Sequence, residues 1–276
     1  MSDLRLDATQ LDRYSRHVIM DEVGPEGQKR LLEGSVLVVG AGGLGSPAIQ
    51  YLAAAGVGHL GIVDDDVVER SNLQRQIVHD DDDVGRPKVE SAADYVHRLN
   101  PDVAVETYET RLTSENVDEL AGEYDVVLDA SDNFATRYLL NDYCVLSGTA
   151  LSHGAIYRFE GQVTTIPNRE GSDGPCYRCV FPEAPEPGTV PDCATTGVLG
   201  VLPGTVGCIQ ATEVVKLLLE QGDVLEGRLL LYDAMDMSFE TVELQRNPNC
   251  PVCGDQPAID SVSDVSYEHT CTIDAD

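Results

Sequence analysis

The stretch VLVVGAGGLGSPAIQYLAAAGVGHLGIVDDD, residues 36–66, decides the fold. It opens with four apolar residues, which are typical of a strand buried on both faces of a parallel sheet. A G-x-G-x-x-G motif follows, then a helix pattern that ends at Gly56, and then a second apolar strand that ends at Asp64. Because strand, glycines, helix, strand and acid occur in this order, the stretch predicts a nucleotide-binding βαβ unit.

The glycines of this motif have separate tasks. Gly40 permits the tight turn after the strand, and Gly42 and Gly43 allow a phosphate to approach bare backbone. Gly45 allows the following helix to lie close to the strand. Asp64 follows at the distance that suits an acid bonded to the ribose hydroxyls.

Strands and helices alternate until about residue 150, and extended stretches then follow one another directly. This pattern predicts an α/β fold, a Rossmann-like, doubly wound, mostly parallel sheet with an antiparallel extension. Helices precede the first strand, within residues 1–34. We expect one domain over residues 1–254, with an irregular crossover loop at 182–204, and a polar, acidic, poorly ordered tail at 255–276.

The chain is extremely acidic: 48 acidic residues face 18 basic ones among 276, for a net charge of −30. The acids are scattered along the whole chain, which favours adaptation to molar salt, where the Debye length falls to about 3 Å and self-repulsion is screened. A surface that repels acidic molecules or attracts a basic partner is the alternative. We expect no nucleic-acid partner for such a surface.

The N-terminus, MSDLRLDATQLDRYSRH, lacks an apolar signal region, and no run of 18 apolar residues occurs. An apolar fraction of 42% is enough for a substantial core. We therefore expect a soluble, cytoplasmic protein that has no membrane partner.

Three acids follow predicted strands, where ligands bind in open α/β sheets. Asp64 follows the second strand, and Asp129 and Asp132 follow the strand near residue 127. Asp132 can hold Mg²⁺, which proteins bind with one or two carboxylates together with substrate phosphates. A turn-forming Ser-Asp-Asn is the other interpretation of this position.

Two basic residues, Arg75 and Lys88, lie in the connection after Asp64, in a chain that has only three lysines. A triphosphate draws in lysine, arginine and a metal, whereas a pyrophosphate needs little beyond backbone N–H groups and a helix N-terminus. A solvated lysine at a helix start is the alternative interpretation of Lys88. Together these residues favour ATP over NAD.

Four of the eight cysteines form two C-x-x-C knuckles, at residues 176–179 and 250–253. Four thiolates at this spacing can make a closed, tetrahedral zinc site, and a redox-active dithiol is the competing interpretation. Cys193 follows a proline-rich run on the crossover loop. There it is either a reactive thiol that reaches a substrate or a free loop cysteine.

Nine segments resemble, in order, those of the ThiF/HesA/MoeB family of ubiquitin-like-protein activating enzymes. They are RYSRHVIM, VVGAGGLGS, NLQRQ, VGRPKVES, LDASDN, GQV, CYRC, TTGVLGVLPG and NPNCPVCG. The resemblance extends from about Leu11 to Gly254, and the acidic composition is similar to that of a haloarchaeal member. It implies that residues 1–254 form an adenylating domain.

The activity that this resemblance implies is adenylation of the C-terminal Gly-Gly carboxylate of a small ubiquitin-like or sulfur-carrier protein. The carboxylate would attack the α-phosphate of ATP and release pyrophosphate, so that catalysis is mostly positioning and charge neutralisation. The purpose would be sulfur transfer (molybdopterin, tRNA thiolation), protein conjugation, or both. No sulfurtransferase domain follows the knuckles in this sequence, so we expect a separate sulfur donor.

The resemblance also implies roles for particular residues. Arg16 would reach into the partner's site in a homodimer, and Cys193 would take the activated carrier. The residues expected in catalysis are Cys193, Arg16, Arg75, Lys88 and Asp132. Those expected to bind ATP are Gly40, Gly42, Gly43, Gly45, Asp64, Ser71, Asn72, Arg75, Lys88, Asp132 and Asn133. The expected metals are a structural Zn²⁺ on Cys176, Cys179, Cys250 and Cys253, and Mg²⁺ on Asp132.

Two other functions stay open at this point. An NAD-dependent dehydrogenase could use the same fold and Asp64, but it would leave Arg75, Lys88 and Asp132 unexplained. A non-catalytic scaffold that binds nucleotide and zinc is the third hypothesis.

If the acidic composition is an adaptation to molar salt, the chain should unfold on transfer from molar potassium chloride to dilute buffer. The reason is that unscreened carboxylates then repel one another. Circular dichroism at both salt concentrations measures this. A chain that stays folded and active in dilute buffer contradicts the hypothesis.

Overall fold

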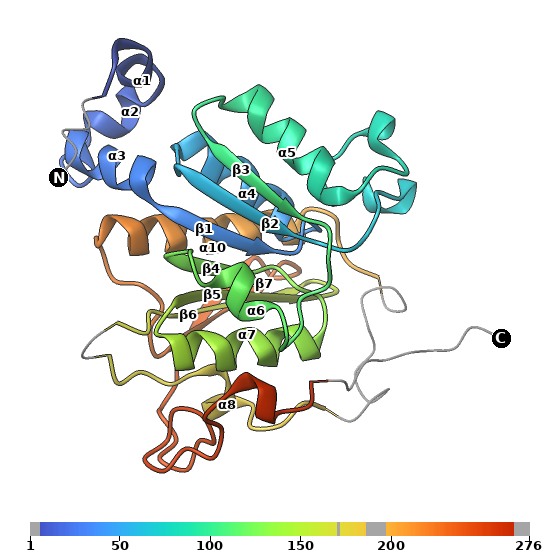
Figure 1. The fold of residues 1–276 in the computed structure, drawn as a ribbon, viewed down its shortest axis with the longest axis vertical. Helices are drawn as coiled ribbons and strands as arrows, with labels where there is room; N and C mark the ends of the chain where they lie inside the picture. Colours follow the sequence, from blue (N-terminus) through green and yellow to red (C-terminus); the bar gives the residue numbers. More distant parts are fainter. Residues whose placement is uncertain (1–5, 170–171, 186–196, 268–276) are drawn as a thin grey trace.

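Residues 6–169, 172–185 and 197–267, described by a computed structural model, form one eight-stranded sheet with helices on both faces (Figure 1). The strand order is β3-β2-β1-β4-β5-β6-β7-β8. The first five strands in this order are parallel, and the last three are antiparallel to their neighbours. The predicted Rossmann-like fold with an antiparallel extension is therefore confirmed.

The strands are short and follow the chain as the apolar pattern predicts. They are β1 (Ser35–Val39), β2 (His59–Val63), β3 (Ala104–Tyr108), β4 (Val126–Asp129), β5 (Ala150–Tyr157), β6 (Glu160–Ile166), β7 (Arg228–Asp233) and β8 (Ser238–Glu243). Strands β1 and β4 lie at the centre of the sheet and are almost fully buried, as expected of parallel strands covered on both faces.

Helices flank the strands in two layers. The α-helices are α1 (Ala8–Arg13), α2 (Ser15–Val18), α3 (Gly24–Glu33), α4 (Gly45–Ala55), α5 (Lys88–Leu99), α6 (Val117–Ala121), α7 (Phe134–Ser147), α8 (Tyr177–Val180) and α10 (Leu202–Leu219). Short 3-10 helices are η1 (Arg70–Asn72), η2 (Asp81–Asp83) and η3 (Val262–Asp264). Side chains of α4, α5 and α10 form the core on one face, and those of α6, α7 and α8 form the core on the other.

The helix α4 crosses β1 at very short range. A Cβ at residue 45 would lie 1.9 Å from the carbonyl oxygen of Gly40, so only glycine fits there. Gly40 has φ +101°, and a Cβ at this residue would lie 2.7 Å from the carbonyl oxygen of Ala130, after β4. The N-terminus of α4 is therefore held against the ends of β1 and β4.

The helix α10 begins three residues earlier than the sequence indicates. Leu202 to Gly204, which we assigned to the crossover loop, form its first turn, because Pro203 has the φ that a first turn needs and lacks only an N–H that would be unpaired there. This helix is apolar and long enough to cross a membrane by length and composition. Half of it is buried, however, and it lies between α4 and strands β5 and β6 as a core helix.

Residues 255–267 depart from our expectation of a poorly ordered tail. Three apolar side chains of this segment, Ile259, Val262 and Tyr267, pack against the core beneath α7. The Tyr267 hydroxyl donates a hydrogen bond to Asp142 Oδ2 at 2.8 Å. Scattered apolar residues without periodicity gave no sign of this docking. Residues 268–276 of the expected tail lie outside the described residues.

Replacement of Gly45 by alanine should lower the free energy of unfolding by about 3 kcal/mol or more, because the new Cβ meets backbone that cannot move aside. Chemical denaturation measures the effect. The matched control is Gly204→Ala in α10, where a Cβ meets nothing within 4 Å and helix propensity should raise stability by about 0.5–1 kcal/mol. Equal effects of the two substitutions would contradict the close crossing.

Candidate nucleotide site and cysteine centre

The predicted nucleotide residues come from the loops that follow β1, β2 and β4, and from the start of α5. Because β1, β2 and β4 are parallel, their carboxyl ends meet at one edge of the sheet. Every residue that we predicted to bind the nucleotide therefore belongs to this edge of the sheet, within a single chain.

Asp64 is tied to the glycine loop, which we define as residues 40–45. Its Oδ2 accepts a hydrogen bond from the Ala41 N–H at 2.8 Å, and its Oδ1 accepts one from the Asp66 N–H at 2.9 Å. Burial raises the pKa of Asp64, and the nearby Lys88 acts in the opposite direction. A carboxylate so placed has lone pairs left for ligand hydroxyls.

Lys88 is buried at the start of α5, with 5% of its surface exposed. Its Nζ lies 2.6 Å from Asp66 Oδ2 and 3.8 Å from Asp64 Oδ1. Buried lysine is rare unless paired, so the solvated-lysine interpretation is wrong. Sequence reasoning missed Asp66 as the partner, although it belongs to the Asp64-Asp65-Asp66 run that we quoted.

The segment around η1 lies beside the glycine loop. Asn72 Oδ1 accepts a hydrogen bond from the Glu69 N–H at 3.0 Å, and the Arg75 guanidinium donates to the Ser71 carbonyl at 3.3 Å. A Cβ at Gly43 would lie 3.7 Å from the Arg75 side chain. Arg75 is therefore next to the glycine loop, and Ser71 and Asn72 lie on the turn that carries it.

The turn after β4 brings the last acid to the same edge. Asp132 is exposed, and Asn133 caps α7 by accepting a hydrogen bond from the Thr136 N–H at 2.9 Å. Asp129 is fully buried, where its Oδ1 accepts from the N–H and the hydroxyl of Ser131. Asp129 thus holds the turn that presents Asp132 to solvent.

Asp129 itself has a buried partner on β5. Its Oδ2 lies 2.7 Å from His153 Nδ1, and both side chains have 1% or less of their surface exposed. Burial opposes ionisation of Asp129, but the hydrogen bond and charge of His153, together with Arg137 and Ser131, outweigh it and lower the pKa of the carboxyl. Burial also lowers the pKa of His153. Because the partners are 24 residues apart in the chain, no local pattern indicates this pair.

Arg16 does not join this site within the chain. It lies on α2, and the neighbouring residues Arg13 and Tyr14 contact the C-terminal end of α5. Figure 1 shows α1 and α2 at the end of the sheet where β1 begins, away from the nucleotide edge. Arg13 donates a hydrogen bond to the Leu99 carbonyl at the end of α5, and the Tyr14 hydroxyl accepts one from Asn100 Nδ2 at 2.8 Å.

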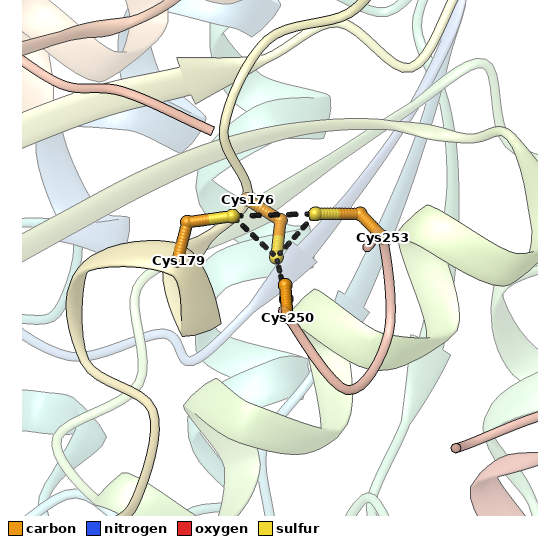
Figure 2. Close-up of side chains that lie close together, drawn as sticks. All are labelled: Cys176, Cys179, Cys250 and Cys253. Carbon is orange, nitrogen blue, oxygen red and sulfur yellow. Dashed lines mark hydrogen bonds between the residues drawn. The ribbon is translucent and has the colours of Figure 1, made fainter. Parts of the chain in front are cut away.

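The four knuckle cysteines converge, with their sulfur atoms directed at one another (Figure 2). Their Sγ–Sγ distances include 3.5 Å for Cys176–Cys250, 3.3 Å for Cys179–Cys253 and 4.0 Å for Cys176–Cys179. Four ligands about 2.3 Å from a tetrahedral zinc ion would be spaced about 3.8 Å apart. The cluster is therefore compatible with zinc.

Both knuckles are held by polar contacts, which are buried at the first knuckle and partly buried at the second. Arg178, inside the first knuckle, donates from Nε and Nη2 to the two oxygens of Asp142 on α7, each at 2.7 Å. Arg246 donates from Nε and Nη2 to the carbonyl of Cys253, in the second knuckle. The Asn247 N–H donates to the sulfur of Cys179 at 3.3 Å, which is a contact that favours a thiolate.

The other cysteines fall into two groups. Burial raises the pKa of the Cys144 thiol and that of the Cys208 thiol, and so makes both unreactive. Cys193 lies outside the described residues, so its role on the crossover loop stays a prediction.

Comparison with known proteins places the chain among nucleotide-using enzymes. The sequence pattern of the ThiF family matches residues 14–252. The chain is 70% identical over 273 residues to the SAMP-activating enzyme E1 of Haloferax volcanii, with 99% of each chain covered. It is 54% identical to the sulfur carrier protein adenylyltransferase of Thermus thermophilus, with 97% of this chain and 99% of that protein covered.

Solved structures give the same fold. Escherichia coli MccB superposes with a TM-score of 0.77 at 21% identity, over 89% of this chain and 73% of that one. A sequence identity of 21% to a solved structure shows the shared fold alone. The family is shown by the ThiF sequence pattern, which matches most of the chain. The chain belongs to the ThiF family.

Proposed function

We propose that this protein adenylates the C-terminal Gly-Gly carboxylate of small ubiquitin-like or sulfur-carrier proteins. The observation that carries the proposal is the grouping of Lys88, Asp64 and the glycine loop at one sheet edge, with Arg75 beside the loop. Asp132 lies on the exposed turn after β4, which ends at the same edge. The relatives named above, a SAMP-activating E1 and a sulfur carrier adenylyltransferase, support it. A dehydrogenase would have no use for a buried lysine beside the ribose acid.

In this proposal ATP lies along the edge, with its ribose on Asp64 and its phosphates over the glycine loop. Lys88 and Arg75 offset the charge of the phosphates, and Ser71, Asn72 and Asn133 line the site. The carrier carboxylate oxygen bonds to the α-phosphorus as the bond to the bridging oxygen breaks. Pyrophosphate leaves with that oxygen, and an acyl-adenylate remains. No proton transfer is needed, so positioning and charge stabilisation provide the catalysis.

Two metals belong to the proposal. Mg²⁺ on Asp132 would supply positive charge to the phosphates. Zn²⁺ on the four knuckle cysteines would be structural, because four protein sulfurs leave no open coordination position for substrate. The same closed arrangement disfavours the redox-dithiol interpretation.

Arg16 requires a second subunit. It lies on α2, away from the nucleotide edge of its own chain, and it can act there only if a partner subunit presents it. We infer a homodimer whose sites are completed across the interface. Cys193, on the crossover loop, would accept the activated carrier after adenylation.

The cellular setting follows from the same features. None of the six cysteines that the structure describes forms a disulfide, in keeping with the reducing cytoplasm. The relatives include enzymes named for sulfur carriers and for SAMP activation. We infer a cytoplasmic enzyme that supplies activated carriers for sulfur transfer, for protein conjugation, or for both.

Carrier-dependent exchange of labelled pyrophosphate into ATP tests the proposal. Lys88→Ala and Asp132→Ala should each slow exchange by about 100-fold or more, because each removes a group that offsets or organises charge at the phosphates. Lys216→Ala, which removes a lysine on α10, should leave the rate unchanged. Cys193→Ala should also keep exchange but abolish transfer from the adenylate.

The outcomes of this experiment separate the hypotheses. Wild-type protein that shows no exchange with any Gly-Gly carrier, but binds NADH, is a dehydrogenase. ATP binding without exchange indicates a scaffold. Normal exchange in Lys88→Ala would refute the role of Lys88.

Substitution of Cys250 by serine should release the bound zinc and lower the free energy of unfolding by more than about 3 kcal/mol, since a closed structural site contributes directly to folding. Zinc content by atomic emission and chemical denaturation measure the two effects. Cys208→Ser, a half-buried cysteine outside the cluster, is the matched control. Wild-type protein that holds no zinc as purified would refute the metal assignment.

A further inference from the structure

His79 lies beneath the glycine loop and has no role in the function proposed above. It is buried, with 6% of its surface exposed. Its Nε2 lies 2.9 Å from the Ala41 carbonyl oxygen, and its Nδ1 lies 2.8 Å from the hydroxyl of Ser91 on α5. His79 therefore connects the glycine loop to the helix that begins with Lys88.

The contact with Ala41 fixes the hydrogen on Nε2. A carbonyl oxygen can only accept, so Nε2 must carry the hydrogen. Burial lowers the pKa of His79 and, with the nearby Lys88, outweighs the hydrogen bond to Ala41 and the charges of Asp83 and Asp80, which raise it. The ring is therefore neutral, with Nε2–H donating to Ala41 and Nδ1 accepting from the Ser91 hydroxyl.

The bond to Ala41 has a consequence for the next residue. A planar trans peptide group directs its C=O and its N–H to opposite sides. Because the Ala41 carbonyl faces His79, the Gly42 N–H faces away from His79. Among the residues that the structure describes, the Gly42 N–H has no acceptor. The N–H of Ala41 is already bonded to Asp64, so this peptide segment is held at both ends.

We propose that His79 is a positioning residue that orients the Gly42 N–H toward the phosphates of ATP. This inference rests on the function proposed above. His79 acts from behind the loop, without touching nucleotide. A neutral ring at this place adds no charge to the site.

Substitutions at His79 test the proposal when nucleotide affinity is measured by calorimetry, without carrier and in molar potassium chloride. His79→Leu removes the donor at similar volume and should lower the affinity for ATP on the order of tenfold, which is the value of a hydrogen bond to a charged group. Adenosine has no phosphate, so its affinity should not change. His79→Gln can place an amide N–H near the position of Nε2 and should restore most of the ATP affinity. Ser91→Ala keeps the bond to Ala41 and should bind ATP normally.

Several results would overturn the proposal. These are unchanged ATP affinity in His79→Leu, equal losses for ATP and adenosine, or ATP affinity in His79→Gln no better than in His79→Leu. Nitrogen-15 NMR of the wild-type rings gives a test that needs no variant to fold: a neutral Nε2–H ring is expected, and an Nδ1–H or doubly protonated ring contradicts it. Wild-type protein that binds no ATP would instead refute the proposed function itself.

Discussion

The close crossing of α4 over β1 is the constraint on which the rest of the site depends. It requires glycine at residues 40 and 45, because a Cβ at either would meet backbone at 2.7 Å or less. The crossing directs the N-terminus of α4 at the edge where β1, β2 and β4 end. Every other element of the nucleotide site is arranged around this helix end.

The site holds two basic side chains, Lys88 and Arg75, in a chain whose net charge is −30. Lys88 lies buried between Asp64 and Asp66, and its Nζ is paired with both carboxylates. In molar salt, long-range attraction between protein and nucleotide is screened within a few ångströms. Recognition of phosphate then depends on contacts at short range, such as a preorganised glycine loop and a fixed lysine.

On the face of the sheet that α6, α7 and α8 cover, polar side chains form a separate hydrogen-bond network. Asp142 on α7 accepts hydrogen bonds from Arg178 in the first cysteine knuckle and from Tyr267 in the C-terminal segment. One buried carboxylate thus joins three distant parts of the chain. We expected residues 255–267 to be poorly ordered because their composition is polar and acidic. They are ordered because a few apolar side chains and one tyrosine hydroxyl find partners on a surface that only the folded domain provides.

The sequence by itself determined the succession of strands and helices along the chain, the glycine motif, the acids at strand ends and the paired knuckles. These follow from residue type and short spacing, which act locally. Only the tertiary structure decided that Arg16 lies away from the site. It also decided which groups meet: Lys88 with Asp66, Asp129 with His153, and His79 with Ala41. Those pairs join residues from 22 to 38 positions apart. Their contacts are set by strand order and helix packing, which no local pattern records.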